Sequence, residues 1–234
     1  MQTLRAAVVV PTLLLSLCAF AEGGNREENR EVSDFDGVAI SHGLEAQVKV
    51  GPKSVRISGD EKRLAQVRTE VVDGKLIVRM EKNSWFGSNS KGVRVTISTP
   101  RLTSVEASGG AEVDAEATTA DTFTVESSGG GELSVRNVDA KSLKVEASGG
   151  GEVTLKGRAD TMKVEASGGA EVHGKDLSLR ALDVEASGGA QVDANPSESV
   201  SADLSGGSTV HVASSPSQRN VSASGGAEVV FRRK

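Results

Sequence analysis

The sequence predicts an all-β protein built as a parallel β-helix with about 18–20 residues per coil. A Ser-Gly-Gly triplet recurs through the second half of the chain, and apolar and polar residues alternate with a period of two on both sides of it. A second loop, rich in Gly, Asn, Asp and Pro, follows each repeat. A fixed period of this size is typical of stacked repeats that bury their apolar faces against one another. The triplets begin at Ser108, Ser128, Ser148, Ser167, Ser187, Ser205 and Ser224.

The alternation defines two strands in each repeat. With the first serine of the triplet as position zero, small or apolar residues occupy positions −5, −3, −1, +3, +5 and +7, such as Val145, Ala147 and Val153 around Ser148. Side chains two residues apart lie on the same side of a strand, so these positions face the core. The glycines turn the chain between the strands. An array of hairpins would fit the same alternation, but the second loop favours nine or ten coils of a β-helix.

An irregular N-terminal β region is expected over residues 32–100, before the regular repeats of residues 101–234. Ser41-His42-Gly43 resembles the triplet, and we interpret it as a divergent first coil with Val48 at the place of Val153. Asp60 can cap a short helix or turn over residues 60–67. Strands are expected at residues 75–80 and 93–98. The loop between them carries Trp85 and Phe86, which would either cover the N-terminal core or contact a sugar or protein.

Residues 1–21 have the pattern of a signal peptide. Arg5 precedes an apolar run over residues 8–17, and Ala19-Phe20-Ala21 forms a small-x-small cleavage site. Cys18 offers a lipoprotein alternative, although Leu17 before it is not small. The polar residues 22–31 are expected to form a flexible leader. We therefore predict an exported protein without a transmembrane segment in the mature chain. The net charge of −5 argues against nucleic acid as a partner.

The order of these segments resembles a known family. The opening DFDGVAISHGLEAQV, the central EVVDGKLIVRM and VRVTISTPRLTSVEASGGAEV, and the serial SGG strands are similar to bacterial head GIN domain proteins, called putative auto-transporter adhesins, a domain of unknown function. The resemblance covers about residues 32–230. It implies a right-handed β-helix of the pectin-lyase-like type and a role in adhesion, and the family has no established catalytic residues. Together with the signal peptide, this predicts a periplasmic, outer-surface or secreted protein whose partner is an envelope or extracellular polysaccharide or protein.

Two columns of carboxylates are the sharpest chemical feature. Both positions face outward, where like charges about 5 Å apart repel by roughly 1 kcal/mol per pair in water. Lys144 and Lys163, two residues before a glutamate of the first column, would offset part of this repulsion. A solvated surface explains the columns, and Ca²⁺ bridging adjacent coils is the alternative. Position −2 carries Glu106, Glu126, Glu146, Glu165, Glu185 and Asp203, and position +4 carries Glu112, Glu132, Glu152 and Glu171.

No catalytic residue and no cofactor is predicted. No His or Lys repeats at a fixed offset from the serines, and His42, His173 and His211 lack the spacing of a metal motif. A polysaccharide-degrading enzyme on a pectin-lyase-like fold stays an alternative, although the loops are short. A self-assembling structural protein is a second alternative, because open β-helix ends can pair with further strands. Phe231 and the basic residues after it would limit such stacking; the oligomeric state is not predicted.

Overall fold

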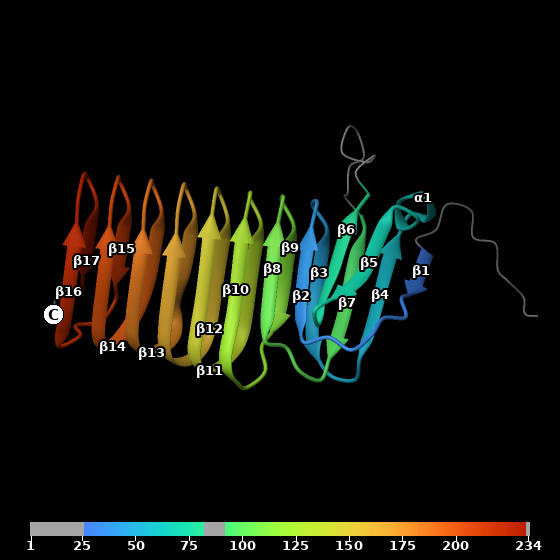
Figure 1. The fold of residues 1–234 in the computed structure, drawn as a ribbon, viewed down its shortest axis with the longest axis horizontal. Coiled ribbons are helices and arrows are strands. Elements are labelled where there is room, and N and C mark those ends of the chain that lie inside the picture. Colours follow the sequence, from blue (N-terminus) through green and yellow to red (C-terminus); the bar gives the residue numbers. More distant parts are fainter. Residues whose placement is uncertain (1–25, 82–91, 233–234) are drawn as a thin grey trace, which may run out of the picture.

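A computed structural model describes residues 26–81 and 92–232, so the expected signal peptide, Cys18, Trp85 and Phe86 lie outside the described residues. The described chain is all-β and forms a parallel β-solenoid of about 6 turns with an irregular sheet at the N-terminal end (Figure 1). The sequence-based fold class is therefore confirmed. The expectation of nine or ten coils is wrong, because part of the N-terminal region forms antiparallel strands instead of further turns.

Each regular turn contributes to two sheets. The strand before each triplet belongs to what we call the upstream sheet, and the strand after it belongs to the downstream sheet. Strands β11 to β14 bend at the second loop and so serve both sheets. The regular strands are β8 (Ser104–Ser108), β9 (Glu112–Glu116), β10 (Ala120–Ser128), β11 (Glu132–Ser148), β12 (Glu152–Ala166), β13 (Glu171–Ala186), β14 (Gln191–Leu204), β15 (Thr209–Val212), β16 (Gln218–Ala223) and β17 (Glu228–Phe231).

Equivalent residues of successive turns pair in register. Glu126 pairs with Glu146, Glu146 with Glu165, and Glu165 with Glu185. The repeats differ in length, and register shifts at the second bend, such as the one between Thr154 and Gly157, absorb the difference. The residues on both sides of each triplet therefore stay aligned although the period varies from 18 to 20 residues.

The inward columns form one continuous core. Val145 and Val153 are 1% and 0% exposed, as the alternation predicts. The core is filled by Val, Leu, Ala and Ile with few larger side chains, among them Phe123 and Met162. At about 25 cal/mol per Å² of apolar surface removed from water, this burial is the main stabilising contribution to the fold.

Glycines at the corner continue the hydrogen-bond ladder between turns. The Gly169 N–H donates to Gly149 O at 2.7 Å, and the Gly189 N–H donates to Gly168 O at 2.6 Å. Gly168 and Gly188 have φ of +72° and +73°, a conformation that is costly for residues with a Cβ. The glycines thus allow both the sharp turn and the close stacking of one corner on the next.

In the N-terminal region, the order of the strands in the sheets differs from their order in the chain. Strands β2 (Gly37–Ser41) and β3 (Glu45–Val50) lie between β6 (Lys75–Met80) and β7 (Arg94–Thr99) on one side and β8 and β9 on the other. Ser41 pairs with Ser108, which confirms the divergent coil, and His42 takes the left-handed corner conformation at φ +64°. The expected place of Val48 is wrong. The register partners place Ala46 at the position of Val153, because the turn after Ser41 has the same length as in the regular repeats.

Antiparallel strands close the N-terminal end of the solenoid. Strand β4 (Ser54–Gly59) pairs with β7, and β5 (Val67–Val72) pairs with β6. The helix α1 (Glu61–Leu64) begins after Asp60, whose carboxylate accepts the Lys62 N–H, as the sequence predicts. The expectation of a flexible leader over residues 22–31 is wrong for residues 26–29. They form strand β1 (Arg26–Asn29), which pairs with the free edge of β4.

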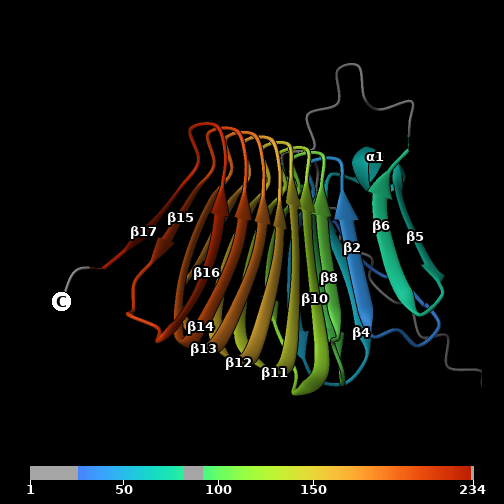
Figure 2. The ribbon, with the colours of Figure 1, turned by 60° about the vertical axis from the view of Figure 1, so that its left-hand side comes forward.

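The C-terminal end is more open. Figure 2 shows β16 and β17 as the last strands of the two sheets, and each pairs with only one described strand, β14 and β15 respectively. Arg219 stands in an inward column, as the register partner of the buried Val200. Its guanidinium carbon lies 4.1 Å from the centre of the Phe231 ring, a cation–π contact that covers the end of the core.

Candidate functional site

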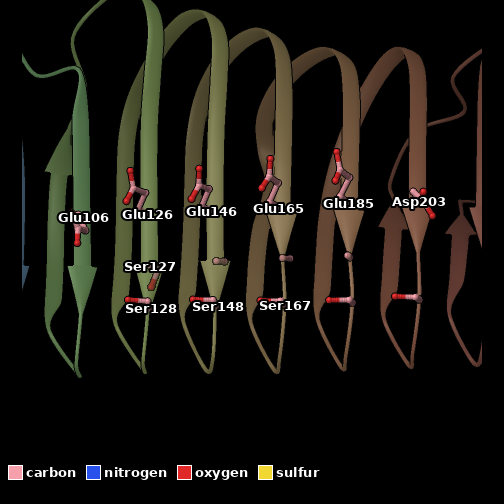
Figure 3. Close-up of a pocket in the computed structure, with 15 residues that line it drawn as sticks. Glu106, Glu126, Ser127, Ser128, Glu146, Ser148, Glu165, Ser167, Glu185 and Asp203 are labelled. Atoms are coloured by element: carbon pink, nitrogen blue, oxygen red, sulfur yellow. The ribbon is translucent and has the colours of Figure 1, made fainter.

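A groove on the upstream sheet brings together the carboxylates of position −2 and the serines of the triplets. We call it the acidic groove; its volume is about 560 Å³. Figure 3 shows the glutamates projecting from successive turns, with the serines in a second row nearer the corner. It is lined by Glu106, Glu126, Glu146, Glu165, Glu185 and Asp203, and by Ser128, Ser148, Ser167, Ser187 and Ser205.

The repeat itself builds this groove. Position −2 lies between the buried positions −3 and −1, so its side chain must point outward. The parallel register then places each glutamate beside its equivalent, about 4.8 Å from the next strand. Among the described triplet serines, only the Ser224 hydroxyl makes a hydrogen bond within the protein, to Leu204 O at 3.4 Å. Hydrogen bonds from one triplet serine to the next are therefore absent from the described residues, and the hydroxyls in the groove can bond to a ligand.

The negative charge of the groove is compensated unevenly. Lys75 Nζ lies 3.2 Å from Glu106 Oε2 at one end. Lys163 Nζ lies 2.8 Å from Glu165 Oε1 and 3.3 Å from Glu185 Oε1, and hydrogen bonds to these two carboxylates raise the pKa of Lys163. The expected offset by Lys163 is thus confirmed.

The centre of the groove lacks such partners. Within residues 26–81 and 92–232, neither Glu126 nor Glu146 forms an ion pair, and the expected contact of Lys144 with Glu146 is not made. Burial raises the pKa of Glu126, opposed by Lys75 and reinforced by Glu106 and Glu146. The centre of the groove therefore favours a hydrogen-bond donor or a cation.

The carboxylates of position +4 line the downstream sheet and are likewise on the outer surface. They include Glu152 and Glu171, which flank His173. Asp193, the register partner of His173, is only 4% exposed although its position faces outward. The alternation did not predict this burial. One signal in the sequence could have indicated the burial of Asp193. Its register partners on the two neighbouring turns are His173 and His211, whose side chains can cover it.

Ion pairs across the second bend connect adjacent turns. Arg158 Nε donates to Asp139 Oδ1 at 2.7 Å, and Arg180 Nε donates to Glu198 Oε1 at 2.9 Å. These hydrogen bonds lower the pKa of both carboxyls. The groups are exposed, where such pairs typically contribute little to stability. This surface is therefore largely self-compensated, in contrast to the centre of the acidic groove.

In the part of the chain that the structure describes, no group of three or more His, Cys, Asp or Glu side chains is placed to hold a metal ion. Ca²⁺ binding by the glutamate columns stays a prediction. The described residues also contain no helix of the length and apolar composition needed to cross a membrane.

The fold and the repeated groove define a parallel β-solenoid with a column of carboxylates on its surface. The family model "putative auto-transporter adhesin, head GIN domain" matches residues 34–216. The chain therefore belongs to the head GIN domain family, as the resemblance of its sequence motifs implied. No curated protein matches the sequence.

Solved structures share the fold at low sequence identity. A putative adhesin from Bacteroides fragilis aligns with a TM-score of 0.83 and 21% identity, covering 90% of this chain and 98% of that chain. A putative lipid binding protein from Parabacteroides distasonis aligns with a TM-score of 0.71 and 14% identity, over 91% and 98%. A putative adhesin from Parabacteroides merdae aligns with a TM-score of 0.61 and 16% identity, over 91% and 98%.

Proposed function

We propose that this protein is an exported, non-catalytic adhesion scaffold that binds an extended polymer along the acidic groove. The polymer would be an envelope or extracellular polysaccharide, or a basic segment of a protein. The observation that carries the proposal is the in-register repeat of one carboxylate and one hydroxyl on successive turns. Membership of a family described as adhesins supports the same function.

A repeated surface suits a repeated ligand. Each carboxylate can accept a hydrogen bond from a sugar hydroxyl or pair with an ammonium group, and each such contact alone is weak. Contacts made by one continuous polymer add up, because the second and later contacts form within the same complex. The uncompensated Glu126 and Glu146 would provide the strongest contacts.

The equivalence of the carboxylates supports a binding role over catalysis. Hydrolysis by paired carboxyl groups requires two members with distinct environments, one held protonated and one ionised. In the acidic groove, successive glutamates occupy the same position of the repeat on neighbouring strands. Such a column of like groups supports repeated binding contacts over a single pair of catalytic carboxyl groups.

Binding of the purified chain to immobilised polysaccharides and to poly-L-lysine tests the proposal. The double variant Glu126→Gln, Glu146→Gln is expected to weaken binding at least about tenfold. The matched control Glu112→Gln, Glu132→Gln removes the same charge from the other sheet and is expected to stay within about twofold of the parent chain. Equal losses in both variants would refute the groove as the binding surface.

Two further measurements test the other parts of the proposal. Release of soluble fragments from any bound polysaccharide would contradict the non-catalytic role. Export is tested by cell fractionation of chains with and without residues 1–21. Retention of both chains in the cytoplasm would contradict the exported location.

A further inference from the structure

We propose that a column of alternating charges at the second bend fixes the order in which the turns of the solenoid stack during folding. We call this column the charge ladder. Its members are exposed on successive turns, and the sign of the charge changes from each member to the next. The proposal does not depend on the proposed adhesive function. The charge ladder consists of Asp121, Lys141, Asp160, Arg180 and Glu198.

The strand register places each member of the charge ladder beside members of opposite sign. Asp121 lies beside Lys141, because the residues on either side of the two are register partners. For the same reason, Lys141 lies beside Asp160, and Asp160 lies beside Arg180. Arg180 reaches Glu198 on the following turn through two hydrogen bonds of 2.9 and 3.2 Å. Opposite charges therefore meet at every step along the ladder.

Contacts and electrostatics agree with this arrangement. Lys141 Nζ lies 2.7 Å from Asp121 Oδ1. Hydrogen bonds to Asp121 and to Glu198 raise the pKa of Lys141 and of Arg180, respectively, and the negative charge of Asp160 raises both further. Asp160 thus interacts with the cation before it and with the cation after it, which links the two ends of the ladder.

The regular repeats need such a device, because their corners do not identify their own neighbours. Residues 105–113 and 164–172 have the same sequence, VEASGGAEV, and the column of the acidic groove carries a carboxylate on each of these turns. A strand that paired one turn too far along would meet nearly the same side chains. The omitted turn would form a surface loop, whose entropic cost grows only slowly with its length. Incorrect assembly of neighbouring repeats is a characteristic failure of repeat proteins.

The alternation makes the omission of one turn unfavourable. If the turn with Asp160 looped out, Lys141 would lie beside Arg180, and two cations would meet. If the turn with Lys141 looped out, Asp121 would lie beside Asp160. Each omission replaces two pairs of opposite charge by one pair of like charge, which is destabilising between neighbouring strands. Exposed ion pairs contribute little to stability, so selection among stacking orders is the role that accounts for the alternation.

Cysteine cross-linking during refolding measures the stacking order. Ser142 pairs with Thr161, and Thr161 pairs with Ala181 one turn further on. Neighbouring strands lie about 4.8 Å apart and strands two turns apart about 9.6 Å, whereas a disulfide requires Cα atoms about 4.4–6.8 Å apart. In a Cys18→Ser chain, the pair Ser142→Cys, Thr161→Cys therefore reports correct stacking. The pair Ser142→Cys, Ala181→Cys reports the omission of a turn.

Each cysteine pair is unfolded in urea with a reductant, refolded by dilution and oxidised, and the disulfide is quantified by peptide mass spectrometry. With the parent ladder, the first pair should cross-link efficiently and the second pair only at a low level. Arg180→Glu repels Asp160 in the correct order and attracts Lys141 when the turn between them is omitted. It should therefore raise cross-linking of the second pair by at least about fivefold. Arg180→Gln should give a smaller increase and provides a second test should Arg180→Glu not fold.

Two controls separate the alternation from other effects of charge. Reversal of all five signs restores the alternation and should return cross-linking of the second pair to the parental level. Arg79→Glu makes the same change of charge outside the ladder, at an exposed ion pair with Glu70 on the neighbouring strand, and should behave like the parent chain. Unchanged cross-linking in both Arg180 variants would overturn the proposal. An equal increase in Arg79→Glu, or an increase that persists after reversal of all five signs, would overturn it as well.

Discussion

The glycine corners allow a stability prediction in which backbone conformation and steric contact are separated. Gly188 combines φ of +73° with a close approach, because a Cβ added there would lie 2.9 Å from Gly168 O. Gly130 has φ of +81° but no heavy atom within 4 Å of an added Cβ. Gly189 lacks a left-handed φ, and its added Cβ would lie at an ordinary 3.6 Å from Gly168 O. Substitution of each by Ala therefore introduces both effects, one effect or neither.

The expected magnitudes follow from these differences. The left-handed conformation costs Ala about 1–2 kcal/mol, and the lower entropy of the unfolded chain returns about 0.4–1 kcal/mol. Gly130→Ala should thus lower the free energy of unfolding by about 0–1.6 kcal/mol. Gly188→Ala must also push the two corners apart and weaken the bond from the Gly189 N–H to Gly168 O, which adds about 1 kcal/mol. Gly189→Ala should change stability by less than about 1 kcal/mol.

Urea denaturation followed by far-ultraviolet circular dichroism measures all three variants under one set of conditions. The expected order of destabilisation is Gly188→Ala, then Gly130→Ala, then Gly189→Ala. Equal losses in Gly188→Ala and Gly130→Ala would refute the contribution of the stacked corner. A loss in Gly189→Ala as large as that in Gly188→Ala would refute the whole argument. The m-value checks that each variant unfolds from a comparable native state.

Two further predictions concern the open end and the acidic groove. Arg219→Leu should increase concentration-dependent self-association in light scattering, because it replaces an inward charge that protects an open edge. The exposed Arg180→Leu is the matched control, and identical behaviour of the two variants would contradict the protective role. Glu126→Gln should raise the melting temperature at pH 7. Burial raises the pKa of this carboxyl, so its favourable contribution is present only below its ordinary pKa and is lost as pH rises through the raised value. The gain should vanish below about pH 4, and the same pH dependence in Glu132→Gln would contradict the assignment.

The repeat allowed much of the fold to be predicted. The spacing of the triplets indicated the coils, and the period-two alternation was enough to assign Val145 to the core and Glu146 to the outer surface. These predictions succeed because a one-residue change of register would move every core side chain to the face exposed to solvent. The alternation therefore fixes which residues face inward. The confirmed helix cap at Asp60 was equally local, since its contact lies two residues away.

Long-range pairing was beyond such reasoning. Nothing in the local pattern indicates that β2 pairs with β8 as well as β6, or that β1 returns to pair with β4. The Asp193 contacts were missed for a related reason. Period-two alternation assigns a side chain to a face, but coverage of that face depends on the neighbours from adjacent turns, here His173 and Lys175.

The place of β2 and β3 has a consequence for the order in which the chain folds. In the regular region each strand finds its partner one repeat away, so turns can form locally and grow outward from any of them. Gly37, in contrast, pairs with Ser104 and Lys75, and closing such long loops costs more conformational entropy. Strands β2 and β3, which are synthesised before β8 and β9, therefore complete their pairing late. Until β8 and β9 have folded, one edge of the N-terminal turn has no partner strand, and the hydrogen bonds between the N-terminal region and the regular turns cannot form.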